Sequence, residues 1–238
     1  MRVENLELKV SLAMETTDIA RRLGEVKSSL PQGVRLVAVS KFHPSECIKA
    51  AYDAGQRLFG ESREQELARK VGELPNDIEW HFIGHLQTNK VKYIAPYISM
   101  IDAVDSLKLL REINKQAKAN GRVIKVLLEL HIAEEETKYG LTLDACRQLL
   151  EGGEWREMQN VQICGLMMMA SHVDDTKLIH DEFCMAADFF NEVKQRYFAD
   201  DDNFCERSWG MSHDYHIAAE CGSTMVRVGT YIFGERAY

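Results

Sequence analysis

The stretch Val34-Arg35-Leu36-Val37-Ala38-Val39-Ser40-Lys41-Phe42-His43-Pro44 begins as an apolar run with valines at alternate positions. A run of this length predicts one strand that is buried on both faces. Lys41 follows where the strand should end, before a turn marked by Pro44. A lysine there is either solvated, which is the commoner case, or chemically employed. Partial desolvation lowers the pKa of a lysine and frees its amine to form a Schiff base with an aldehyde.

The length of 238 residues suits one large α/β barrel or two small domains. With 45% hydrophobic and 28% charged residues, the composition is that of an ordinary soluble protein. The formal net charge of −8 argues against a nucleic acid or an anionic membrane as the partner. No apolar run reaches membrane-spanning length and the N-terminus has no signal-peptide core, so we expect a cytoplasmic protein. Its six cysteines show no paired spacing, which predicts reduced and mostly buried thiols.

Strand and helix patterns alternate along the whole chain. The predicted strands cover residues 35–40, 56–59, 78–83, 98–101, 123–130, 161–166, 204–209 and 225–228. The predicted helices cover residues 5–30, 44–55, 62–73, 88–95, 106–120, 142–152, 175–197 and 214–221, with Ser106 and Thr142 as N-caps. Eight βα repeats behind an extra N-terminal helix predict one (β/α)8 TIM barrel that spans residues 1–238 as a single domain. An open doubly wound sheet is the alternative, which is weakened because no Gly-x-Gly-x-x-Gly follows the first strand.

In such a barrel the carboxyl ends of all strands meet at one face, where ligands bind. Lys41 lies there, and the loops after strands seven and eight form the usual phosphate site of this fold. Ser212 would supply a hydroxyl, and Gly229 and Thr230 would open a short terminal segment with unpaired backbone N–H groups. A phosphate site that faces a Schiff-base lysine indicates a phosphorylated aldehyde. Pyridoxal 5′-phosphate fits that description, and so does the substrate of a sugar-phosphate aldolase.

A set of motifs in fixed order also connects the chain to a known family. The motifs are Ala38-Val39-Ser40-Lys41, Phe59-Gly60-Glu61-Ser62, His81-Phe82-Ile83-Gly84-His85-Leu86-Gln87-Thr88-Asn89-Lys90, Lys138-Tyr139-Gly140, Gly165-Leu166-Met167, Gly210-Met211-Ser212-His213-Asp214 and Gly222-Ser223-Thr224-Met225-Val226-Arg227-Val228-Gly229-Thr230-Tyr231-Ile232-Phe233-Gly234. With them the chain closely resembles the YggS/PROSC family of pyridoxal 5′-phosphate homeostasis proteins over residues 35 to 235. The resemblance implies a barrel of the alanine racemase N-terminal type that binds pyridoxal 5′-phosphate.

By that resemblance Lys41 carries the cofactor as an aldimine and Arg227 faces the pyridine nitrogen. Ser212, Gly229 and Thr230 would hold the phosphate. Two positions depart from the family pattern, which has Asn where this chain has Ser62 and Asn where it has His131. Both are expected to face the ring, and Ser62 is counted among the cofactor-binding residues. Without the motifs, a carboxylate on the barrel rim would be the expected partner of Arg227.

Three functions fit these residues: a carrier of pyridoxal 5′-phosphate, a racemase and a Schiff-base aldolase. We expect a carrier without catalytic residues, which passes the cofactor to apo-enzymes and is a monomer or a weak homodimer. Racemisation needs a second acid–base group opposite the lysine. In the related racemase a second domain of the partner subunit supplies it, and this chain ends ten residues beyond strand eight. The charged Arg227 would moreover keep the pyridine nitrogen unprotonated and so a poor electron sink.

Two histidine pairs, a run of methionines and a run of glutamates remain, and none of them predicts a further site. The pairs His81/His85 and His213/His216 have helical spacing, but no cysteine or carboxylate set completes either, so we expect no metal. We expect Met167-Met168-Met169 to pack around the site and Glu134-Glu135-Glu136 to be a solvated loop.

Overall fold

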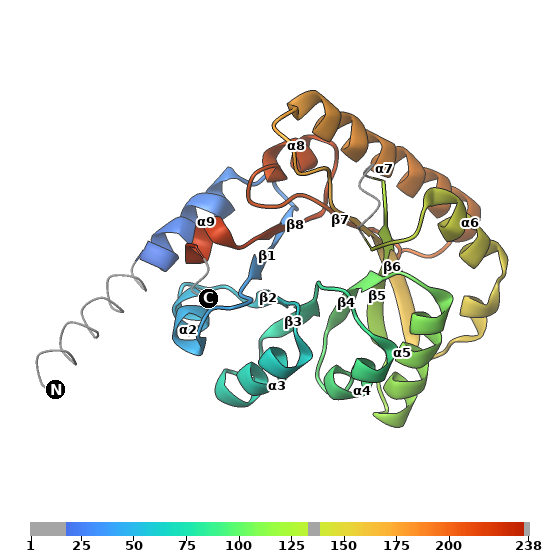
Figure 1. The fold of residues 1–238 in the computed structure, drawn as a ribbon, viewed down its shortest axis with the longest axis horizontal. Helices are drawn as coiled ribbons and strands as arrows, with labels where there is room; N and C mark the ends of the chain where they lie inside the picture. The colour runs from blue at the N-terminus through green and yellow to red at the C-terminus, as the bar shows by residue number, and fades with distance from the viewer. Residues whose placement is uncertain (1–17, 133–138, 236–238) are drawn as a thin grey trace, which may run out of the picture.

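The computed structural model describes residues 18–132 and 139–235, and these residues form one closed parallel barrel. Its strands follow each other around the ring in chain order (Figure 1). They are β1 (Arg35–Val39), β2 (Leu58–Glu61), β3 (Glu79–Phe82), β4 (Met100–Val104), β5 (Ile124–Leu130), β6 (Val161–Met168), β7 (Glu206–Ser208) and β8 (Met225–Val228). β8 pairs with β1 from Arg35↔Met225 to Ala38↔Val228 and so closes the ring. This pairing confirms the predicted (β/α)8 barrel and rules out the open sheet.

Helices surround the barrel on the outside (Figure 1). They are α2 (Ser45–Asp53), α3 (Glu64–Glu73), α4 (Val91–Ile94), α5 (Leu107–Ala119), α6 (Leu143–Glu151), α7 (Thr176–Tyr197), α8 (Tyr215–Glu220) and α9 (Thr230–Phe233), with 3-10 turns at Thr88–Lys90 and Glu154–Glu157. The predicted N-terminal helix is present over residues 18–29, and its predicted part before residue 18 lies outside the described residues. Both predicted N-caps are confirmed, because the Ser106 and Thr142 hydroxyls accept from the N–H groups of Leu109 and Ala145.

Three predicted elements need correction. β2 begins at Leu58, because the buried amide of Gln56 instead donates to the carbonyls of Leu36 and Leu58 at 2.8 and 2.7 Å. β4 covers Met100–Val104 and not 98–101, since the barrel buries the charged side chain of Asp102 completely. The predicted helix over 88–95 is a 3-10 turn followed by the short α4. Local patterns could not show that the polar side chains of Gln56 and Asp102 would be buried.

The apolar core has two parts. The larger cluster lies between the barrel and its helices, and a smaller one fills the barrel interior with Val37, Leu58, Met100, Ala103, Leu127, Cys164, Met167 and Met225. β6 and β7 approach so closely that a Cβ on Gly165 would lie 1.9 Å from the carbonyl oxygen of Glu206. This contact explains the glycine in the Gly165-Leu166-Met167 motif.

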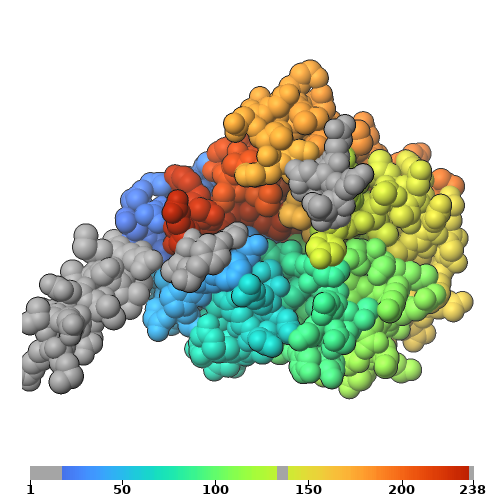
Figure 2. Space-filling model, in the orientation of Figure 1, coloured from blue at the N-terminus to red at the C-terminus, as the bar shows by residue number. Residues whose placement is uncertain are grey.

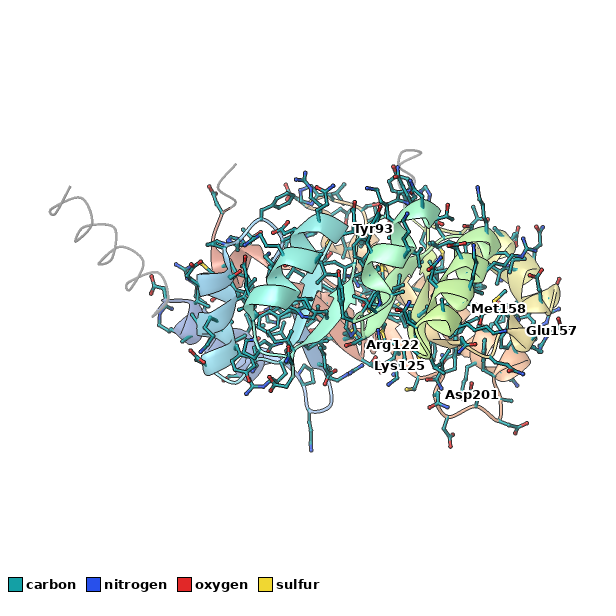
Figure 3. The ribbon with its side chains drawn as sticks, turned by 90° about the horizontal axis from the view of Figure 1, so that it is seen from below. Tyr93, Arg122, Lys125, Glu157, Met158 and Asp201 are labelled. Atoms are coloured by element: carbon teal, nitrogen blue, oxygen red, sulfur yellow. The ribbon has the colours of Figure 1, made fainter. Side chains whose placement is uncertain are left out.

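The two ends of the barrel differ in what they carry. Figure 3 views the barrel from the side, with Arg122, Lys125 and Asp201 toward the end where the strands begin. The loops that follow the strands form the opposite end, where the site lies. No helix among the described residues is both long enough and apolar enough to span a membrane.

Candidate functional site

A cavity of about 270 Å³ lies at the carboxyl ends of the strands. Its lining consists of Val39, Lys41, His43, Ile83, Met169, His172, Met211, Ser212, His213, Arg227, Gly229 and Thr230. Five of the six predicted binding residues therefore surround one space, and Ser62 is the exception. The volume is near the lower end of the roughly 300–1,000 Å³ that small-molecule sites occupy. The cavity thus suits a small ligand.

Lys41 lies two residues after the end of β1 and is half-buried, in agreement with the strand-end prediction. A buried cluster holds the backbone on both sides of it. On one side, the Ser40 hydroxyl donates to Glu61 at 2.6 Å. On the other, the Phe42 N–H donates to Glu66 at 2.7 Å, and Phe42 has a left-handed backbone with φ of 70°. The loop that carries Lys41 is therefore anchored at its two neighbours.

Lys70 joins these anchors from α3. Its ammonium is fully buried and donates to Glu61 at 2.7 Å, to Glu66 at 2.6 Å and to the carbonyl of Ser40 at 2.9 Å. Burial raises the pKa of Glu61, and the charge of Lys70 acts in the opposite direction. The sequence reasoning missed this role of Lys70. The available signal was its position three residues after Leu67, which is on the buried face of α3.

Arg227 in β8 is 4% exposed and lies at the cavity. Its guanidinium donates to the carbonyl and the hydroxyl of Ser208 at 2.6 and 2.8 Å, and to the carbonyl of Met168 at 2.8 Å. Burial lowers the pKa of Arg227, while the charges of Asp102, Asp214 and Glu129 raise it. These hydrogen bonds go to neutral oxygens of β6 and β7, and not to a carboxylate on the rim.

A buried polar layer continues from Arg227 across the barrel. Ser208 donates to Asp102 at 3.2 Å, and Asp102 lies 2.9 Å from Nδ1 of His81. His81 is in β3, as predicted. His85 lies beyond the end of β3, with its Nδ1 3.2 Å from a carboxylate oxygen of Asp105. Burial raises the pKa of Glu129 in β5 to about 7. Through Ser208, the layer connects Arg227 at the cavity with the buried carboxyl group of Asp102.

The loop after β7 has a shape that only glycine permits at its start. Gly210 has φ of 96°, and a Cβ there would lie 2.6 Å from Cβ of Ala218. Asp214 accepts a hydrogen bond from the N–H of Met211 and is 1% exposed. These contacts fix the segment that carries Ser212, which explains the Gly210-to-Asp214 motif.

The loop after β8 meets the end of β1. The Gly229 N–H donates to the Ser212 hydroxyl at 3.2 Å, and a Cβ on Gly229 would lie 2.9 Å from the carbonyl oxygen of Val39. Gly229 therefore lets the two loops close around the Lys41 strand, and Thr230 begins α9. In Figure 2 the red surface of α9 lies against the blue N-terminal helix, and the Tyr231 hydroxyl donates to Glu25 at 3.1 Å.

Several lining residues were not predicted. The rings of His172 and His213 meet edge to face with centroids 5.0 Å apart, and Nε2 of His213 lies 3.2 Å from Asp214. Because β6 extends to Met168 and not only to residue 166, its loop reaches the cavity with Met169 and His172. The Met167-Met168-Met169 prediction is thereby refined: the three side chains lie in the barrel interior, in the outer core and at the cavity, respectively.

Other predicted positions lie elsewhere. Ser62 is half-buried against Gly84, and His131 follows β5, and neither is among the cavity-lining residues. Residues 134–136 lie outside the described residues. Of the cysteines, three are buried, whereas Cys184 and Cys221 are half-buried and Cys205 is exposed, so the expectation of mostly buried thiols is only half right.

The fold and this cavity define a barrel of the alanine racemase type. The family model described as "Alanine racemase, N-terminal domain" matches residues 15–237. The protein named pyridoxal phosphate homeostasis protein from Aquifex aeolicus is 38% identical over 205 residues, 86% of this chain and 88% of that one. The human protein of the same name is 36% identical over 230 residues, 92% of this chain and 82% of that one. The chain therefore belongs to the family of pyridoxal phosphate homeostasis proteins.

Solved structures of related proteins have the same fold. PipY of Synechococcus elongatus with pyridoxal phosphate bound has a TM-score of 0.82 and 36% identity, and the match covers 91% of this chain and all of PipY. Alanine racemase from Clostridium difficile has a TM-score of 0.72 at 14% identity and covers 93% of this chain but 58% of the racemase. At that identity the racemase shows the shared fold only.

Proposed function

We propose that this chain binds pyridoxal 5′-phosphate in the cavity and hands it on to apo-enzymes, as a homeostasis protein without substantial turnover of its own. The observation that carries the proposal is that Lys41 and Arg227 meet Ser212, Gly229 and Thr230 around one cavity. The solved PipY structure with pyridoxal phosphate supports it from the same family. The proposal further includes a single domain over residues 1–238, a cytoplasmic location and a monomer or weak homodimer.

The residues present fit this cofactor. Bound pyridoxal 5′-phosphate supplies an aldehyde that reacts reversibly with amines. Lys41 would hold it covalently, and the hydroxyls of Ser212 and Thr230 would bind the phosphate together with the backbone at Gly229 and Thr230. Arg227 offers donors only, so a ring nitrogen that faces it would be kept unprotonated. The tight contact of Gly229 with Val39 brings the phosphate loop to the strand end that bears Lys41.

A racemase remains the second candidate because of one observation. His172 and His213 line the cavity and could exchange protons with a bound substrate, as racemisation requires of a group opposite the lysine. Arg227 weighs against that reaction, since an unprotonated ring stabilises a carbanion poorly. Carrier function is therefore the better supported proposal.

The first test maps the lysine. The protein is loaded with pyridoxal 5′-phosphate, reduced with borohydride and digested, and we expect the added pyridoxyl mass on Lys41 alone. Lys41→Ala should lose the visible absorption band and the mass. Lys49→Ala removes a lysine that is paired with Asp53 outside the cavity, and it should keep both. Modification of Lys90 in place of Lys41 would contradict the assignment.

The second test separates carrier from racemase. We expect cofactor transfer to an apo-enzyme by the loaded protein, loss of this activity in Lys41→Ala, and negligible racemisation of alanine or serine. Racemisation at ordinary enzyme rates that disappears in His172→Ala would establish the racemase in its place.

A further inference from the structure

Two helices on the outer surface bring a histidine and two cysteines together, away from the cavity. His180 and Cys184 lie four residues apart on α7, which places them on one helix face. Cys221 is the residue that follows the last turn of α8. Figure 1 shows that α8 lies beside the first part of α7. The three ligand atoms all lie within 4.8 Å of one another.

The separations match those of a metal site. The two sulfurs are 3.6 Å apart, and the Cys184 sulfur is 3.7 Å from each ring nitrogen of His180. Around a tetrahedral zinc ion, with Zn–S of about 2.3 Å and Zn–N of about 2.0–2.1 Å, neighbouring ligand atoms lie about 3.8 Å apart for two sulfurs and about 3.6 Å apart for sulfur and nitrogen. The ligand atoms are thus already spaced as two edges of such a tetrahedron.

The surroundings of His180 agree with this geometry. Nδ1 of His180 lies 3.6 Å from a carboxylate oxygen of Asp181. A histidine that binds a metal commonly directs its other ring nitrogen at a carboxylate, which orients the ring and raises its basicity. The Asp181 carboxylate is beyond hydrogen-bond distance here, so a small turn of the His180 ring would direct Nδ1 at it and Nε2 at the ion. His180 is exposed and both cysteines are half-buried, so an ion can enter from solvent.

We propose that His180, Cys184 and Cys221 form a zinc-binding site with water as the fourth ligand. Two thiolates and one imidazole are a ligand set that suits zinc. The ion would join α7 to α8, and both helices hold loops of the cavity. Glu182 of α7 accepts hydrogen bonds from the N–H and hydroxyl of Ser171, and α8 follows the Met211–Asp214 turn.

The test measures zinc on the full-length protein, prepared free of metal and kept reduced with a non-chelating phosphine. We expect one zinc ion per chain in competition with a chromophoric chelator. We also expect cobalt(II) to give the near-ultraviolet charge-transfer band of a thiolate-bound ion. Cys184→Ser and His180→Ala should each weaken zinc binding at least tenfold, and Cys184→Ser should diminish the cobalt band.

Cys205→Ser is the matched control, because Cys205 is exposed and is no part of the cluster. It should bind zinc and cobalt as the unsubstituted chain does. His180→Ala changes an exposed side chain and keeps the test valid if a cysteine variant misfolds, which circular dichroism would show. The proposal is overturned if the folded protein binds no zinc, or if His180→Ala and Cys184→Ser bind zinc as tightly as the unsubstituted chain does.

Discussion

Lys70 is a fully buried lysine whose three partners lie next to the residue that we propose to hold the cofactor. Its ammonium contacts Glu61, Glu66 and the carbonyl of Ser40, the residue before Lys41. A buried ion pair adds little net stability over apolar packing, but the removal of one partner leaves an uncompensated charge. The cluster therefore serves to position the Lys41 loop.

Replacing Lys70 with methionine should lower the free energy of unfolding by about 3–5 kcal/mol, because Glu61 would stay buried without its cation. The comparison is Lys49→Met, which breaks an exposed pair with Asp53 and should cost less than about 1 kcal/mol. Urea titration of both variants checks this expectation. In Lys70→Met the affinity for pyridoxal 5′-phosphate should also fall. Equal losses in the two variants would refute the role of Lys70.

At the scale of elements, two short segments shape the proposed phosphate site. α8 and α9 have six and four residues, and each follows a loop that lines the cavity. Helices this short are not stable alone, so packing determines where they form. α9 is held against the N-terminal helix by Tyr231 and Glu25, which links the first helix of the fold to the end of the barrel.

If the hydroxyl of Thr230 binds the phosphate, Thr230→Ala should remove one charge-assisted hydrogen bond, worth about 1.5–3 kcal/mol. The affinity for pyridoxal 5′-phosphate should then fall roughly tenfold or more. Binding of pyridoxal, which lacks the phosphate, should be unchanged. Absorbance titrations with both aldehydes measure this. Thr176→Ala, at the start of α7 and outside the cavity lining, should leave both affinities alone. An equal loss for the two aldehydes would count against the phosphate contact.

At the scale of the whole molecule, barrel closure encloses a charged layer that no single element predicts. Glu129, Asp102 and Arg227 come from three different strands and are all nearly or fully buried. Burial raises the pKa of Glu129 to about 7 from an ordinary value of 4.5, and nearby Asp105 adds to the shift. The stability of the barrel should therefore depend on pH above the ordinary range of a carboxyl group.

The raised pKa of Glu129 determines whether stability rises or falls with pH. Below pH 4.5 Glu129 holds its proton in both folded and unfolded chains. Between pH 4.5 and about 7 the unfolded chain releases that proton first, so stability falls as the pH rises. The shift corresponds to about 3 kcal/mol. Glu129→Gln should be nearly as stable as the unsubstituted chain at pH 4.5 and more stable at pH 8. Urea unfolding at both values tests this, and a difference that does not vary with pH would contradict it.

Local sequence patterns are sufficient to predict the barrel and most of the proposed site. Buried strands and amphipathic helices are local patterns, and eight repeats of them leave few ways to pack. In a parallel barrel every strand end faces the same side, so Lys41, Ser212, Gly229, Thr230 and Arg227 had to converge. Ser62 follows β2 but is not among the residues that line the cavity.

Which polar groups are buried, and which distant residues touch, depends on the packing of the whole chain. The burial of Gln56 is compensated by hydrogen bonds to the carbonyls of Leu36 in β1 and Leu58 in β2, and Asp102 accepts from Ser208 in β7. The Lys70 cluster joins a helix to two strand ends, and Cys184 meets Cys221 across 37 residues. Neither the Lys70 cluster nor the contact between Cys184 and Cys221 produces a periodic pattern in the sequence. Each depends on the packing of one helix against its neighbours, which is set by the closed ring as a whole.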